Sequence, residues 1–164
     1  MIARGKGRRM RNHLIKCIVF SVFFCLPVIS EGKEFNSSEY ILMLGDRPQA
    51  TCEDVVTIFM LQTGKTPKGY DKDVSALRDA GIGAPERAAT DPLRRGEAAG
   101  MVARFFKLKQ SFFFNIFDSD RYAVRACVAA GIMEEDTSEW DLLSGEQLLE
   151  IMRRAGEKAE GGAK

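Results

Sequence analysis

The chain has 164 residues, with 24 basic and 23 acidic side chains and a formal net charge of +1. Six of the basic residues lie within the first thirty positions, which hold no acidic residue, so the rest of the chain has 18 basic against 23 acidic side chains and a net charge near −5. Nucleic acid is therefore a poor partner, because phosphate binding needs a basic surface. The single histidine, His13, lies in the same segment, so the remainder lacks the commonest general base and metal ligand.

Residues 1–30 have the layout of a secretory signal peptide. Their basic residues precede an apolar stretch from Cys17 to Ile29, and Val28 and Ser30 occupy the small-residue positions of a cleavage site. An uncleaved membrane anchor is the alternative, although the stretch is shorter than the about 20 residues that a span needs. We expect an exported protein of the periplasm, cell envelope or cell surface that touches the membrane only through this segment, if it is not cleaved.

Two cysteines, Cys52 and Cys127, remain outside the signal segment. Exported proteins meet an oxidising environment, so one alternative is a disulfide between them. The other is that both are small buried residues. Two cysteines without a histidine do not make a zinc site, and the sequence predicts neither a metal nor a cofactor.

The rest of the chain repeats itself. The pattern Val74-x-Ala76-x-x-x-Ala80-Gly81-Ile82 returns as Val124-x-Ala126-x-x-x-Ala130-Gly131-Ile132. Asp54, Glu97 and Glu146 each precede apolar residues two, five and six positions later, which share one helical face. A helix of this kind buries its apolar face only against neighbours, so we predict an all-α fold of about two and a half stacked helical hairpins.

The predicted organisation is an extension at 31–49, a helical domain at 50–155 and a flexible tail at 156–164. Units are expected at about 50–83, 93–133 and 143–155. Helices are predicted at 38–44, 51–62, 72–80, 94–106, 120–130 and 144–155. Thr51 and Asp54 form the expected capping box of the second of these helices, and Gly81 and Gly131 are expected to end two others.

The second unit resembles an S-layer homology repeat. The resemblance rests on Leu93-Arg94-Arg95-Gly96-Glu97-Ala98-Ala99, Phe117-Asp118, Tyr122-Ala123 and Ala130-Gly131-Ile132. The first unit follows more loosely with Thr51-Cys52-Glu53-Asp54, Tyr70-Asp71 and Gly81-Ile82, and the third supplies only Leu143-Ser144-Gly145-Glu146 and its helix. The resemblance implies a three-lobed helical bundle that attaches exported proteins to cell-wall polysaccharide or peptidoglycan. It also implies a motif arginine that faces anionic groups in a groove between lobes.

Only Arg95 occupies that arginine position, because Cys52 and Ser144 take its place in the other units. A guanidinium suits bidentate recognition of a carboxylate or phosphate, so Arg95, with Arg94 and Glu97, is the candidate ligand-binding set. The alternative is an arginine that is solvated or paired with Glu97. The acids that open the helices are interpreted first as caps, with ligand contact as the alternative.

Aromatic residues concentrate between the helices of the second unit. They are Phe105, Phe106, Phe112, Phe113, Phe114 and Phe117. Burial in the core is the first interpretation, and a docking patch at Phe112, Phe113 and Phe114 is the second. Trp140 either stacks on a sugar or packs over the last helix.

Three functions follow, in decreasing order of preference. The first is a non-catalytic module that binds cell-wall glycan, and the second is a helical assembly subunit that binds an envelope protein. The third is a glycan hydrolase that uses two acids among Asp118, Asp120 and Glu97. An EF-hand calcium loop at Asp118 and Asp120 is excluded, because Ala123 and Ala129 occupy its glycine and glutamate positions, and Asp120 is interpreted as a helix cap.

Overall fold

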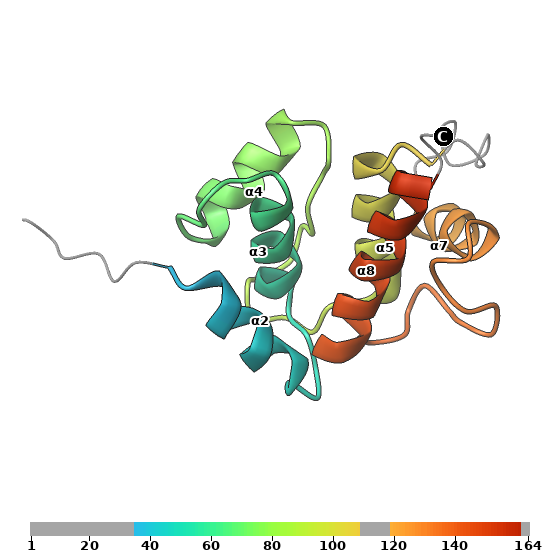
Figure 1. Ribbon diagram of the computed structural model, residues 1–164, viewed down its shortest axis with the longest axis horizontal. Helices are drawn as coiled ribbons and strands as arrows, with labels where there is room; N and C mark the ends of the chain where they lie inside the picture. The colour runs from blue at the N-terminus through green and yellow to red at the C-terminus, as the bar shows by residue number, and fades with distance from the viewer. Residues whose placement is uncertain (1–34, 109–118, 162–164) are drawn as a thin grey trace, which may run out of the picture. The chain divides into compact units, whose positions relative to one another are not determined.

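Six helices and no strands make up the part of the chain that this computed structural model describes, residues 35–108 and 119–161 (Figure 1). They are α2 (Ser37–Gly45), α3 (Cys52–Gln62), α4 (Tyr70–Asp79), α5 (Arg95–Phe105), α7 (Asp120–Ala129) and α8 (Gly145–Gly161). The prediction of an all-α fold is confirmed. None of these helices is long and apolar enough to cross a membrane.

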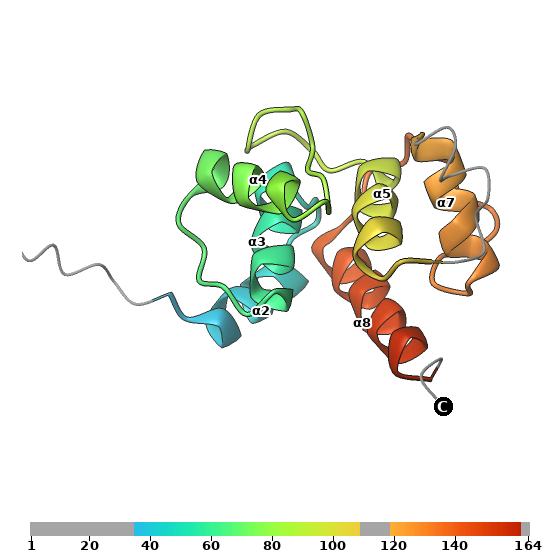
Figure 2. The same ribbon diagram turned by 90° about the horizontal axis from the view of Figure 1, so that it is seen from above.

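The helices pack in pairs, α3 with α4, α5 with α7, and α8 with α2. The third pair joins the two ends of the described chain, and both views show α8 beginning beside the end of α2 (Figures 1 and 2). The amide of Gly145 donates to the carbonyl oxygen of Arg47 at 3.0 Å. The sequence predicted a third unit consisting of one helix alone; the structure corrects this, because α2 supplies its second helix.

A closed ring of three backbone hydrogen bonds connects the three pairs. The amide of Leu93 donates to Ala50 (2.8 Å), that of Ala50 to Leu143 (2.8 Å), and that of Leu143 to Leu93 (3.1 Å). All three residues are buried, and each stands two positions before the first residue of α3, α5 or α8. The starts of these three helices are therefore held together at one centre.

Each of these three helices is also capped by the segment that leads into the next one around the ring. The first helical amides, of Cys52, Arg95 and Gly145, donate to the carbonyl oxygens of Asp91, Asp141 and Arg47 at 2.9, 2.8 and 3.0 Å. Amides at a helix start have no partner within the helix. The loops satisfy them, so these helix starts are not free anion sites.

A side-chain cap also stands at the start of each of these three helices. Asp54 accepts from the amide of Thr51 (2.8 Å), which confirms the capping box, and Glu97 accepts from the amide of Arg94 (2.9 Å). In α8 the equivalent pair is Ser144 and Gln147, which exchange bonds of 3.0 and 3.1 Å.

The predicted register of the third unit is therefore wrong by one residue. Gln147, and not Glu146, is the counterpart of Glu97, because an amide side chain caps a helix start as an acid does. It follows that Gly145, and not Ser144, is the counterpart of Arg95 as the first helical residue.

The repeated Ala-Gly-Ile pattern ends α4 and α7. Gly81 and Gly131 have φ of 73° and 71°, a region that favours glycine. The amides of the following Ile82 and Ile132 donate back into their helices, and both isoleucines are buried.

Two helix bounds differ from the prediction by more than one residue. α4 begins at Tyr70, two residues early, because Asp73 accepts from the amides of Lys68 and Gly69 and holds the turn that leads into the helix. α8 continues to Gly161, so the predicted tail is wrong up to that residue. Gly156 does not end the helix, which carries ion pairs of Glu150 and Glu157 with Arg153 across this region.

Candidate functional site

A groove of about 280 Å³ lies where the start of α5, the turn after α7 and one face of α8 meet. Apolar side chains and five charged side chains line it. The lining is Arg95, Ile132, Met133, Glu134, Glu146, Gln147, Glu150, Ile151 and Arg154. The groove therefore contains the arginine that the sequence analysis selected, together with residues of two other segments.

Arg95 is the first residue of α5, and its side chain is 11% exposed. Its Nε is buried and has no hydrogen-bond partner among the described residues. Asp141 Oδ2 lies 3.7 Å from this nitrogen, close enough for an ion pair but not for a hydrogen bond. A buried N–H without an acceptor costs about 1–3 kcal/mol, so the guanidinium of Arg95 is incompletely satisfied within the fold.

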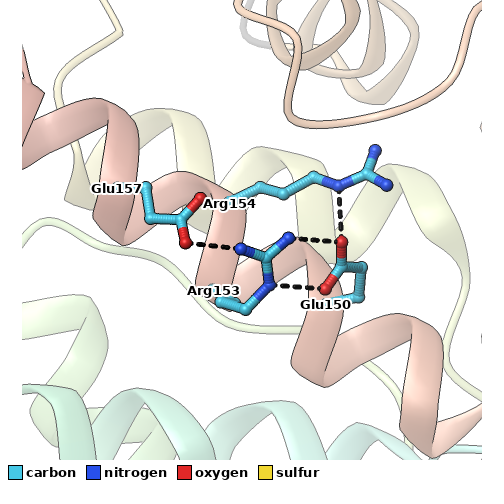
Figure 3. Close-up of polar contacts among 4 residues, drawn as sticks. All are labelled: Glu150, Arg153, Arg154 and Glu157. Atoms are coloured by element: carbon cyan, nitrogen blue, oxygen red, sulfur yellow. Dashed lines mark hydrogen bonds and ion pairs between the residues drawn. The ribbon is translucent and has the colours of Figure 1, made fainter.

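Arg154 brings a second guanidinium to the groove. Its Nε donates to Glu150 Oε1 at 2.7 Å, while Arg153 bonds both oxygens of Glu150 and also reaches Glu157 (Figure 3). In this view the two terminal nitrogens of Arg154 point away from Glu150. Sequence pattern does not single out Arg154, because an arginine four residues after a glutamate is typical of a solvated helix pair.

The hydrogen bonds from Arg153 and Arg154 keep Glu150 ionised. They lower the pKa of this carboxyl to about 2. The groove thus presents two guanidinium groups and three carboxylates, those of Glu134, Glu146 and Glu150. Such a mixture offers donors and acceptors together, which fits a ligand rich in hydroxyl groups better than a polyanion.

No known protein family, curated protein or solved structure matches this chain.

Arg94 and Glu97 do not line the groove with Arg95. The Arg94 guanidinium lies over the ring of Trp140, 5.1 Å from its centroid. Glu97 caps α5 and forms an ion pair with Arg87 at 3.5 Å. Trp140 is 65% exposed, so the interpretation that it packs over the last helix is wrong. Its partner is the side chain of Arg94.

Both cysteines are buried and free, so the disulfide alternative is not realised and the buried-residue alternative is. Cys127 lies within α7 with its thiol 3.8 Å from the carbonyl oxygen of Ala99, whereas Cys52 is the first residue of α3. Burial raises the pKa of Cys127 to about 12. Burial, and then the charge of Glu97, raises that of Cys52 to about 11.

The predicted docking patch, Phe112, Phe113 and Phe114, lies outside the described residues, as do Phe117 and Asp118. Phe105 and Phe106 pack partly buried against the core, in edge-to-face contact with each other (4.8 Å). Phe105 also contacts Phe59 of α3 at 5.5 Å.

Of the acids considered for hydrolysis, the structure describes Glu97 and Asp120. Glu97 is engaged as a cap, and Asp120 is the first residue of α7, whose cap position belongs to Ser119. The interpretation of Asp120 as the cap itself is therefore wrong by one residue. Within residues 35–108 and 119–161, no three side chains are placed to hold a metal ion together.

Proposed function

We propose that this protein is an exported, non-catalytic module of the cell envelope that binds cell-wall polysaccharide or peptidoglycan in the groove at Arg95. The observation that carries the proposal is the groove of about 280 Å³ that Arg95 and Arg154 line together with Glu134, Glu146 and Glu150. The resemblance of the second unit to S-layer homology repeats and the signal-like residues 1–30 point in the same direction.

The chemistry of the groove supports binding more than catalysis. Arginine stays protonated at all ordinary pH values and is a poor proton carrier. A glycosidase needs a carboxylic acid with a raised pKa, and Glu150 between its two arginines has a pKa lowered to about 2. These groups are suited to hold and orient hydroxyl, amide and carboxylate groups of a glycan.

A second candidate function is assembly with an envelope protein, and one surface favours it. α2 exposes three consecutive apolar side chains, Ile41, Leu42 and Met43, which are 40%, 74% and 55% exposed. Exposed apolar patches are common at protein interfaces. If this function holds, replacing Leu42 and Met43 by Ser should abolish co-purification of an envelope protein and leave binding to cell walls unchanged.

Co-sedimentation with purified cell-wall sacculi tests the leading proposal. The unmodified protein should sediment, and Arg95→Ala should remain in the supernatant with an unchanged helical circular dichroism spectrum. Arg95→Lys should bind weakly, because an ammonium group does not reproduce the planar donor pair of a guanidinium. A wild-type protein that stays in the supernatant would refute wall binding.

A further inference from the structure

The loop from Ser138 to Leu142 is held firmly against the start of α5. Its carbonyl oxygens at Glu139 and Asp141 accept from the amides of Gly96 and Arg95 at 3.0 and 2.8 Å. Asp141 also accepts from the amide of Ser138 at 2.8 Å, and Leu142 forms an isolated bridge with Arg94. The backbone on both sides of Trp140 is therefore fixed.

Trp140 displays a large apolar surface on this fixed loop. It is 65% exposed, so the Arg94 guanidinium, 5.1 Å from the ring centroid, covers one face of the indole at most. A cation over an aromatic face is attracted by the ring and holds its orientation. The indole is thus a preorganised flat surface that the fold leaves uncovered.

The surroundings of Trp140 are charged. Arg94 lies over the ring, and the chain neighbours are Glu139 and Asp141, of which Asp141 is 46% exposed. Protein-binding hot spots place a tryptophan within a desolvated apolar centre. An aromatic face on a loop with charged, hydrogen-bonding neighbours instead matches a sugar ring, which has a C–H face and a rim of hydroxyl groups.

We propose that Trp140 is a stacking platform for one sugar ring of a glycan, which packs on the indole face opposite the Arg94 guanidinium. The inference rests on the proposed function and extends it, since Asp141 is also the ion-pair partner of Arg95 and connects this loop to the groove. The ligand class is a hexopyranose or its N-acetylamino derivative within a chain. The indole contacts the C–H face of the sugar ring, so binding needs no charge on the sugar.

Trp140 is the only tryptophan of the chain, so its fluorescence reports on this site alone. We would titrate the purified protein with the tetrasaccharide of N-acetylglucosamine and with glycan strands released from sacculi. Stacking should change the emission in a saturable manner and reduce quenching by acrylamide at least about twofold. The absence of both effects with both probes overturns the proposal.

Variants separate this proposal from the function on which it rests. Trp140→Ala should weaken sedimentation with sacculi about tenfold, and Trp140→Phe, which keeps a flat ring, should retain most of it. Leu142→Ala is the matched control, since Leu142 is an apolar side chain of the same loop and is 49% exposed. Equal losses for Trp140→Ala and Leu142→Ala would indicate a general apolar contact and overturn the proposal.

The remaining outcomes are also distinct. If the wild type sediments, Arg95→Ala does not, and Trp140→Ala behaves as the wild type, the platform is wrong and the groove proposal stands. If the wild type does not sediment, both are wrong. A fluorescence change produced only by envelope proteins, and not by either glycan probe, overturns the sugar platform in favour of a protein interface.

Discussion

The carbonyl oxygen of Leu44 in α2 lies where a side chain on Gly145 would begin. A Cβ added to Gly145 would be 1.7 Å from this oxygen, a distance that no structure tolerates. Glycine at the first position of α8 therefore permits the last helix to pack against the N-terminal one. This contact explains how two segments about a hundred residues apart complete one helix pair.

Gly145→Ala should separate α8 from α2 and destabilise the fold. Overpacking against backbone costs about 1–3 kcal/mol or more, because the backbone must move. Gly156→Ala in the same helix is the control, since no atom lies within 4 Å of a Cβ there, and it should stabilise by about 0.5–1 kcal/mol. Urea denaturation followed by circular dichroism measures both; a Gly145→Ala variant as stable as the wild type would refute the assignment of α2 to this pair.

Asp54 is a heavily bonded carboxylate, and it is 1% exposed. It accepts from Tyr40 and Arg47 at 2.6 Å each and from Thr51. Burial, and then the hydrogen bond to Asp54, raises the pKa of the Tyr40 hydroxyl. All these donors are aimed at one carboxyl group.

Asp54→Asn should lower the free energy of unfolding by about 1–3 kcal/mol, because an amide cannot accept from all these donors. The loss stays moderate since Arg47 is 37% exposed and can return to solvent. Glu53→Gln, at the exposed neighbouring position, is the control and should change stability by less than about 0.5 kcal/mol. Equal effects of the two variants in urea denaturation would contradict the role given to Asp54.

Features of the repeats that depend on local backbone conformation were predictable from the sequence. The Gly81 and Gly131 turns and the Thr51 cap depend on residues within a few positions, so spacing alone predicts them. The pairing of α2 with α8 was not predictable in this way, because it depends on a contact between distant segments and on a glycine whose role appears only beside Leu44.

The candidate site was predictable in part for the same reason. Arg95 follows from its position in a motif, whereas Arg154 enters the groove only through the packing of α8 against the start of α5. Its neighbour Arg153 has the same charge and also bonds Glu150, yet it does not line the groove. Sequence pattern cannot distinguish these two arginines.

The two buried thiols should make the fold sensitive to alkaline pH. The pKa values of Cys52 and Cys127, ordinarily near 9, are raised to about 11 and 12. Above pH 9 the folded state keeps thiol protons that the unfolded state loses. The stabilisation that comes from the two protonated, buried thiols is therefore fully present below pH 9 and is lost as pH rises through 11 to 12. Each thiol adds a slope of up to about 1.4 kcal/mol per pH unit in that window.

Urea denaturation between pH 8 and 11 measures this slope, and Cys127→Ala should flatten it. Labelling supplies an independent check, because a protonated buried thiol is a poor nucleophile. In the chain without residues 1–30, both thiols should resist iodoacetamide at pH 8 in buffer and react in denaturant. Rapid labelling of the folded protein, or a bridge detected by mass spectrometry, would contradict two buried free thiols.

Arg153 and Arg154 provide the sharpest test of the groove. Both are bonded to Glu150, but only the free edge of Arg154 is available to a ligand there (Figure 3). Arg154→Ala should therefore weaken sedimentation with sacculi about tenfold, the loss of roughly one charge-assisted hydrogen bond of about 1.4 kcal/mol. Arg153→Ala should bind as the wild type does.

Because the Arg153→Ala and Arg154→Ala variants each leave one arginine on Glu150, their stabilities in urea should agree within about 0.5 kcal/mol. Equal binding by the two variants would show that the ligand does not occupy this groove.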